Sequence, residues 1–207
     1  MELSISILNA KDRKKMIKTL NETNISYLHI DVMDGNFVPH KEFSKEEIIE
    51  LSQMSKKKLD IHLMVNDPLE YIEIIKDIPN VEYITIHFEI DKDIKNILSK
   101  IKSYGIKAGL SIKPNTDINK LLPFIEDIDL VLLMTVEPGE GGQKFISSSS
   151  NRLEELSAIL NSNIKIEVDG GINNETINNV KEADIAVVGS YITTSDNPIE
   201  KINNLLV

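Results

Sequence analysis

The chain has 207 residues, of which 41% are hydrophobic and 27% charged, and this composition excludes a disordered or fibrous protein. Its net charge of -10 and pI near 4.9 argue against a nucleic-acid groove, because such grooves hold phosphate with clustered Lys and Arg. The sequence has no cysteine, no signal-peptide pattern and no apolar run of about 18 residues. We therefore expect a cytoplasmic protein without disulfides, nucleic-acid partners or membrane partners.

Apolar and β-branched runs recur at a steady interval along the chain and predict eight strands. The runs span residues 3–8, 25–31, 59–65, 81–88, 106–112, 128–136, 164–171 and 184–190.

Stretches of helical character lie between most of these strands. Examples are "DRKKMIKTLNET", "SKEEIIELSQMSKK" and "DKDIKNILSKIKSYG", which follow the first, second and fourth strands. In the third example apolar residues recur at spacings of three and four, and charges fill the other face. Ser44, three residues before Glu47, predicts a capping box, and Gly105 predicts the end of a helix.

The alternation of strand and helix predicts parallel strands joined by right-handed crossovers. Eight units of about 26 residues match a (β/α)₈ TIM barrel, and we predict one barrel domain over residues 1–207. A doubly wound open sheet is the rival fold. Its dinucleotide-binding versions need G-x-G-x-x-G after the first strand, where this chain has "ILNAKD".

Three of the predicted strands carry polar residues on one face. In the second strand Leu28, Ile30 and Val32 share one face, while His29 and Asp31 lie on the other. The third and seventh strands repeat the pattern. In a barrel, the apolar faces would meet the helices and the polar faces would point inward, toward the end of the barrel that carries the chemistry.

Four of these polar residues are expected to converge at the carboxyl ends of their strands: His29, Asp31, His62 and Asp169. Two imidazoles and two carboxylates predict a site for one divalent metal ion, Zn, Mn, Fe or Co, and contain too much nitrogen to favour Mg or Ca. Asp34, next to Gly35, is interpreted as a turn residue. His40 and His87 are left outside the site, His87 as a hydrogen-bonded core residue.

Glycine clusters follow the last three strands. They read "EPGEGGQKF", "DGGIN" and "GS", over residues 137–145, 169–173 and 189–190. TIM barrels commonly bind phosphate after the seventh and eighth strands, through backbone N–H groups. The clusters therefore predict a phosphate site that needs neither Lys nor Arg, which agrees with the acidic composition.

Together these motifs closely resemble the ribulose-phosphate 3-epimerase family, over residues 3–192. The resemblance is carried, in the family's order, by "SISILNA", "HIDVMDGNFVPH", "DIHLMV", "AGLSIKPNT", "LLMTVEPGEGGQKF", "EVDGGIN" and "VGS". It implies a metal-dependent isomerase of the pentose phosphate pathway, with a sugar-phosphate substrate and often a homo-oligomeric assembly.

The resemblance also implies roles for individual residues. Ser6 would contact the substrate, as would the metal ligands His62 and Asp169, and Asp31 and Asp169 would form the acid–base pair. Three methionines, which spacing alone assigns to core packing, would line the site: Met33, Met64 and Met134. The phosphate would lie on Gly139, Glu140, Gly141, Gly142, Gly170, Gly171, Gly189 and Ser190.

The implied reaction interconverts D-ribulose 5-phosphate and D-xylulose 5-phosphate. Two carboxylates on opposite faces of carbon 3 would transfer the proton through a metal-stabilised enediolate. A 3-epimerase of a hexulose 6-phosphate, such as allulose 6-phosphate, is one alternative, and a non-catalytic sugar-phosphate-binding barrel is another. A metal-dependent barrel hydrolase would often carry His-x-His on its first strand, where this chain has "SISIL".

Three positions depart from the family pattern. Glu140 stands where phenylalanine is usual, and a carboxylate there should repel phosphate if it points inward. Lys11 replaces a common acidic residue and Glu182 a usual glycine, and both are interpreted as surface changes.

Overall fold

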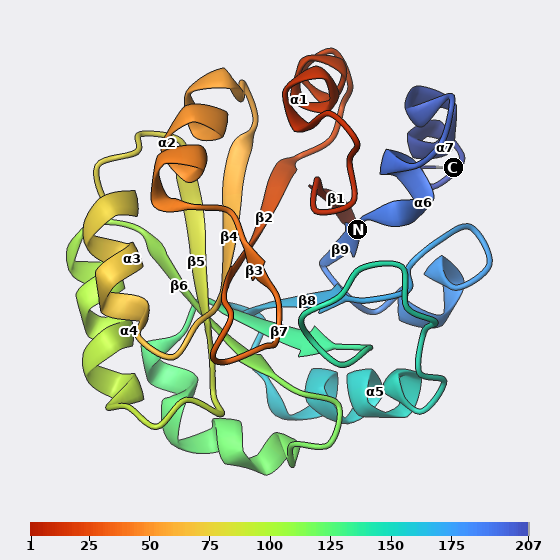
Figure 1. Cartoon of the computed structure of the whole chain (residues 1–207). Coiled ribbons are helices and arrows are strands. Elements are labelled where there is room, and N and C mark those ends of the chain that lie inside the picture. The colour runs from red at the N-terminus through yellow and green to blue at the C-terminus, as the bar shows by residue number, and fades with distance from the viewer. Residues whose placement is uncertain (207) are drawn as a thin grey trace.

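In the computed structural model, which describes residues 1–206, eight parallel strands close into a barrel with helices around it (Figure 1). This confirms the predicted (β/α)₈ TIM barrel. β1 pairs with both β9 and β2 and thereby closes the sheet, and the short β3 runs antiparallel to the end of β2. The strands are β1 (Glu2–Ser6), β2 (Tyr27–Asp34), β3 (Lys41–Glu42), β4 (Lys58–Met64), β5 (Val81–His87), β6 (Lys107–Ile112), β7 (Leu130–Met134), β8 (Lys165–Asp169) and β9 (Ile185–Val188).

The connections carry α-helices after most strands and 3₁₀ helices after β6 and β8. The helices are α1 (Arg13–Asn21), α2 (Lys45–Met54), α3 (Pro68–Ile75), α4 (Ile94–Ser103), η1 (Ile118–Asp127), α5 (Ser149–Ile159), η2 (Ile177–Val180), α6 (Ser190–Thr193) and α7 (Pro198–Asn203). Pro123 lies inside η1, and because proline has no N–H it disfavours a regular α-helix there. Within residues 1–206 no helix is long and apolar enough to cross a membrane.

The predicted capping box at Ser44 and the predicted helix end at Gly105 can be compared with the structure. Ser44 Oγ accepts a hydrogen bond from the Glu47 amide at 3.2 Å and so caps α2. The capping box is only half made, since the Glu47 carboxylate accepts from Arg13 on α1, at 2.8 Å. Gly105 ends α4 as predicted, with φ at +76°, and its amide donates to the Lys102 carbonyl at 3.0 Å.

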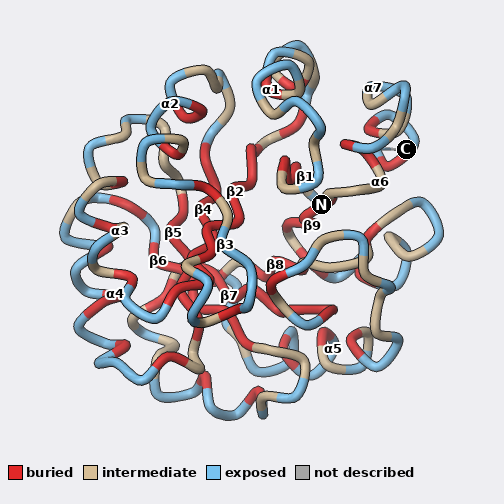
Figure 2. The backbone as a smooth tube through the Cα atoms, viewed as in Figure 1, coloured by how far each residue is buried: buried red, intermediate tan, exposed pale blue. Residues whose placement is uncertain are grey.

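The barrel strands are buried on both faces, and Figure 2 shows them as the buried centre of the molecule. Outward residues such as Leu28, Ile30 and Val32 belong to the large apolar core beneath the helices. Inside the barrel, a second apolar cluster includes Tyr27 and Ile185 where their strands begin and extends along β7 to Met134 and Val136. The polar inward residues lie nearer the other end, so the barrel has an apolar base and a polar mouth.

The centre of the barrel leaves no room for a side chain at Gly109 on β6. A Cβ atom at Gly109 would lie 2.2 Å from Thr85 Oγ1 and 3.1 Å from Leu130 Cδ2. We expect Gly109→Ala to lower the free energy of unfolding by about 1–3 kcal/mol, the usual cost of overpacking a core. Thermal unfolding followed by circular dichroism measures this loss.

A double-mutant cycle with Thr85→Ala provides the control, because removing the hydroxyl clears the closest contact. Gly109→Ala should cost less in the Thr85→Ala background than in the parent chain. An equal cost in both backgrounds would contradict the proposed clash.

Candidate active site

The strand register brings the four predicted metal ligands together at the mouth of the barrel. Asp31 Oδ1 lies 3.3 Å from His29 Nε2 and 3.4 Å from His62 Nδ1. Asp169 Oδ2 lies 3.9 Å from the same His62 nitrogen, and one ligand atom from each of the four residues lies within 4.8 Å of the others. β2, β4 and β8 each contribute at least one member, as the alternation of their faces predicted.

The arrangement fits a divalent metal ion. His29 Nε2 and His62 Nδ1 are buried and have no hydrogen-bond partner among the described residues, and both face Asp31. Burying two ring nitrogens without a partner is costly, and a cation between them and the two carboxylates removes that cost. A set of two nitrogen and two oxygen ligands is typical of Zn, Mn, Fe and Co.

A buried carboxylate holds the far side of the His29 ring. Asp60 Oδ2 lies 2.6 Å from His29 Nδ1 and also accepts from Ser4 Oγ at 2.7 Å. In the neutral ring that a metal ligand must be, this contact places the hydrogen on Nδ1 and leaves Nε2 free toward Asp31. Glu167 completes this second buried cluster, and burial together with the charge of Asp60 raises the pKa of Glu167 well above its ordinary value.

Sequence reasoning did not assign Asp60 and Glu167 to the site. The signal was present, because each stands two residues before a predicted ligand, on the same inward face of its strand.

The structure identifies the hydrogen-bond partner of His87. His87 is a buried, hydrogen-bonded residue, as expected, but its partner is a predicted metal ligand, with His62 Nε2 and His87 Nε2 2.8 Å apart. Burial lowers the pKa of His87 to about 4, so the ring is neutral near pH 7. His40 is exposed and lies away from the site, as predicted, and Asp34 accepts hydrogen bonds from the amides of Asn36 and Phe37 in the expected turn.

The two carboxylates of the quartet differ in acidity. Burial works to raise the pKa of Asp31, but the imidazoles of His29 and His62 outweigh it and hold that pKa below its usual range. Burial and the negative charge of Asp31 raise the pKa of Asp169 to about 6. Asp31 is therefore the stronger acid of the pair, and it stays ionised where Asp169 can hold a proton.

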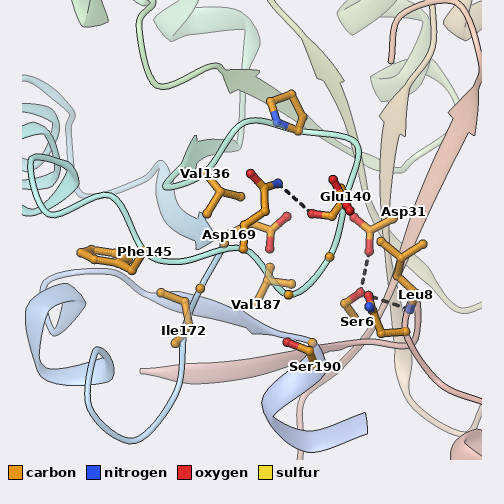
Figure 3. A pocket seen from close by; sticks show the side chains of 18 of the residues that line it. Ser6, Leu8, Asp31, Val136, Glu140, Phe145, Asp169, Ile172, Val187 and Ser190 are labelled. Atoms are coloured by element: carbon orange, nitrogen blue, oxygen red, sulfur yellow. Dashed lines mark hydrogen bonds between the residues drawn. The ribbon is translucent and has the colours of Figure 1, made fainter. Parts of the chain in front are cut away.

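A pocket of about 620 Å³ opens above the quartet (Figure 3). Asp31 and Asp169 line it, whereas His29 and His62 are fully buried behind its wall. Ser6 also lines the pocket and donates to Asp31 Oδ2 at 2.6 Å. The three methionines named above, residues 33, 64 and 134, are on its wall. The volume lies within the usual range of small-molecule sites.

The predicted phosphate loops form one side of this pocket. All eight residues of the predicted set, over 139–142, 170–171 and 189–190, line it. Gly171 has φ at +68°, and a Cβ there would lie 2.3 Å from the Phe145 amide nitrogen, so only glycine allows the two loops to pack this closely. Gln143 Nε2 donates to the carbonyls of Glu137 and Glu140, which fixes the shape of the first loop.

The charge around these loops is unfavourable for an anion. Three carboxylates line the pocket near the loops, those of Glu137, Glu140 and Glu175, and Lys144 is the cation among the lining residues. Among the described residues, the amides of Gly141, Gly142 and Gly171 donate no backbone hydrogen bond. Such free amides are the groups available to bind phosphate here.

Comparison with known proteins gives a consistent picture along the whole chain. The sequence profile described as the Ribulose-phosphate 3 epimerase family matches residues 1–193. The chain is 36% identical to the ribulose-phosphate 3-epimerase of Helicobacter pylori strain J99, over 99% of this chain and 98% of that protein. It is also 36% identical to the Bacillus subtilis protein of the same name, over 85% of this chain and 83% of that protein.

Solved structures agree on the fold. A 3-hexulose-6-phosphate synthase superposes with a TM-score of 0.74 at 14% identity, covering 99% of this chain and 98% of that one. A 3-hexulose-6-phosphate synthase from Salmonella typhimurium gives 0.73 at 16% identity, covering 99% and 96%. At these identities the likeness concerns the barrel alone.

The acidities above predict how metal binding depends on pH. Burial works to lower the pKa of His29, but Asp60 and Asp31 raise it well above its ordinary value, so the metal-free ring is protonated near pH 7. A metal ligand must be deprotonated, so we expect metal binding near pH 7 to release about one proton from His29. As the pH falls through about 6, Asp169 also becomes protonated, so more protons are released and affinity falls more steeply.

Calorimetric titration with Mn²⁺ in buffers of different ionisation enthalpy measures the number of protons released. An Asp169→Asn variant should lose the additional release below pH 6 and keep the release near pH 7. Proton release that is constant from pH 8 to pH 5 would contradict these assignments.

Proposed function

The chain belongs to the ribulose-phosphate 3-epimerase family, and from this premise we propose that it interconverts D-ribulose 5-phosphate and D-xylulose 5-phosphate. One observation carries the proposal: two imidazoles and two carboxylates lie within 4.8 Å of one another at the base of a pocket whose side is built from glycine loops. The first group suits a metal ion and proton transfer, and the second suits a phosphate.

Binding would place the two ends of the substrate in different parts of the pocket. The phosphate would accept hydrogen bonds from loop amides such as those of Gly142, Gly171 and Ser190. The carbonyl end would reach Ser6 and the carboxylates, with the three methionines packing against the carbon chain. This orientation brings carbon 3 between Asp31 and Asp169.

We propose that His29, Asp31, His62 and Asp169 hold one divalent ion, Zn, Fe, Mn or Co. When bound, the ion would act as a Lewis acid that stabilises the negative charge developing on the substrate oxygens as the carbon-bound proton leaves.

The two carboxylates would divide the proton transfer between them. Asp31, the more acidic residue, would be ionised and would take the proton from carbon 3. Asp169, whose pKa lies closer to neutrality, would be the acid and would give a proton, carried on the carboxyl oxygen that does not hold the ion, to the opposite face of the same carbon, which inverts the centre. The reaction leaves Asp31 protonated and Asp169 ionised, and the reverse reaction exchanges the roles.

Two further properties belong to this proposal. A rice relative, 36% identical over 86% of this chain, is named a cytoplasmic isoform, and we propose the same location here. We also propose a homo-oligomer, and light scattering on the purified protein measures that state. Cell fractionation tests the location.

The deciding experiment is conversion of D-ribulose 5-phosphate with and without a chelator, after loading with Mn, Fe, Co or Zn. Conversion that is lost with chelator and restored by metal supports the proposal, and no conversion with any of the four metals contradicts it. Faster turnover of allulose 6-phosphate would favour a hexulose 6-phosphate epimerase. Tight binding without exchange of the carbon 3 hydrogen with deuterated solvent would favour a non-catalytic sugar-phosphate-binding protein.

Replacing either carboxylate should abolish the reaction. We expect Asp31→Asn and Asp169→Asn each to lower kcat by at least about 10²-fold, the usual contribution of a positioned acid or base. Because both residues are also proposed ligands, metal content is measured beside the rate. A variant that retains metal and turns over at a near-native rate would show that its carboxylate is not part of the pair.

Glu140 should weaken binding of the phosphate. We expect Glu140→Gln to lower KM by on the order of fivefold with little change in kcat, since two unit charges about 4 Å apart in water repel by about 1 kcal/mol. Glu182→Gln is the matched control, because it removes the same charge from an exposed residue that does not line this pocket. Equal KM values in the two variants would mean that the Glu140 carboxylate does not act on the phosphate.

A further inference from the structure

His87 lies between the proposed metal ligand His62 and the carboxylate of Glu89, and its ring contacts both. Its ring is fully buried on β5, and its Nε2 lies 2.8 Å from Nε2 of His62 on β4. The ring planes differ by 29° and the centroids lie 5.0 Å apart, so the two rings meet edge to edge through these nitrogens. Phe37 packs against His87, with ring centroids 4.7 Å apart. Two ring nitrogens at hydrogen-bond distance share one hydrogen, so one ring donates and the other accepts.

The direction of this hydrogen bond follows from the position of His62 in the quartet. Its Nδ1 faces Asp31 at 3.4 Å and has no hydrogen-bond partner within residues 1–206, so this is the atom available to a metal. A neutral ring that ligates through Nδ1 carries its hydrogen on Nε2. His62 is therefore the donor and His87 Nε2 the acceptor.

His87 must then carry its own hydrogen on Nδ1, and a carboxylate accepts it there. Glu89 Oε2 lies 3.1 Å from His87 Nδ1. The other oxygen, Oε1, accepts from the Lys113 amide at 2.8 Å and from the Thr116 hydroxyl. Every donor in this series faces an acceptor, so a single assignment of hydrogens satisfies all the contacts.

The hydrogen bonds that run from His62 through His87 to Glu89 end on residues 113–116, which are themselves held in place. Residues 113–116 follow β6, and their carbonyls accept from the guanidinium of Arg152 on α5, at 3.2 Å for Lys113 and 2.6 Å for Thr116. Glu89 is thus fixed from the side away from the metal. The residues that anchor Glu89 do not line the pocket.

We propose that His87 and Glu89 are positioning residues that select the tautomer of His62 and hold its Nδ1 toward the metal. This inference rests on the proposed metal site and deepens it. Carboxylate or carbonyl groups commonly orient metal-bound histidines, and here a second histidine stands between the ligand and the carboxylate.

Three variants on the β5 strand separate orientation from packing. His87→Leu fills similar space without an acceptor, and His87→Gln restores an amide oxygen that can accept from His62. Thr85→Val is the matched control, because Thr85 is also buried on β5 and its hydroxyl has no hydrogen-bond partner in the described part of the chain. Co²⁺ affinity is measured by competition with a chromogenic chelator, together with the visible spectrum of the bound ion.

We expect His87→Leu to weaken Co²⁺ binding by about 10- to 100-fold and to change the visible spectrum, as loss of such a contact usually does. His87→Gln should recover most of the affinity, and Thr85→Val should bind like the parent chain. Parental affinity and spectrum in His87→Leu would overturn the proposal, as would an equal loss in Thr85→Val.

A second measurement needs no variant and decides the matter even if His87→Leu fails to fold. In the parent chain loaded with Zn²⁺, ¹⁵N correlation spectra of the imidazole rings should show the hydrogen of His62 on Nε2 and that of His87 on Nδ1. A His87 hydrogen on Nε2 would overturn the proposal.

The outcomes also separate this inference from the proposed function. A parent chain that binds Co²⁺ and loses it in His87→Leu, but has no epimerase activity, supports the positioning role and contradicts the function. A parent chain that binds no divalent metal contradicts the metal site and the positioning role together.

Discussion

Asp31 Oδ1 lies between two imidazole nitrogens, 3.3 Å from His29 Nε2 and 3.4 Å from His62 Nδ1. This shared contact requires a particular register, in which Ser6 of β1 lies opposite His29 and Asp31 opposite His62 of β4. A slip of one residue on β2 would turn both polar residues toward the helices and their apolar neighbours into the barrel. The register of the first three barrel strands therefore decides whether the site exists.

The polar interior has a cost that the rest of the fold offsets. His29, Asp60 and Glu167 are fully buried, and groups of this kind destabilise a core unless they are paired. Along each of these strands the polar inward residues alternate with apolar outward residues. The outward residues pack beneath the helices, and their burial stabilises the barrel. The strands hold the proposed metal ligands and the loops hold the proposed phosphate site, so the rigid part of the fold positions the chemistry.

The sequence was sufficient to predict whatever depends on alternation along one strand. The eight strands, the quartet and the glycine loops follow from two features of the sequence. Residues i and i+2 share a face of a strand, and each apolar run ends where a loop begins. The contact between His62 and His87 does not follow from these features, because it depends on an irregular register between β4 and β5. The β4–β5 register shifts between Leu59 and Asp60, which sets His62 opposite Thr85, with His87 two residues further along β5. The partner of Glu47 also depends on tertiary context, which residue pattern alone does not specify.

A protein with a net negative charge can bind an anion only where groups close to the anion attract it more strongly than the protein's carboxylates repel it. The chain has a net charge of -10, and carboxylates of residues 137, 140 and 175 line the pocket. At physiological ionic strength charges more than about 8 Å apart are largely screened, so most of the surface charge has little effect on a bound phosphate. The carboxylates beside the loops are not screened in this way. Affinity then depends on backbone amides at hydrogen-bond distance working against a few neighbouring carboxylates, and small changes in that balance would alter substrate binding without changing the proton-transfer groups below.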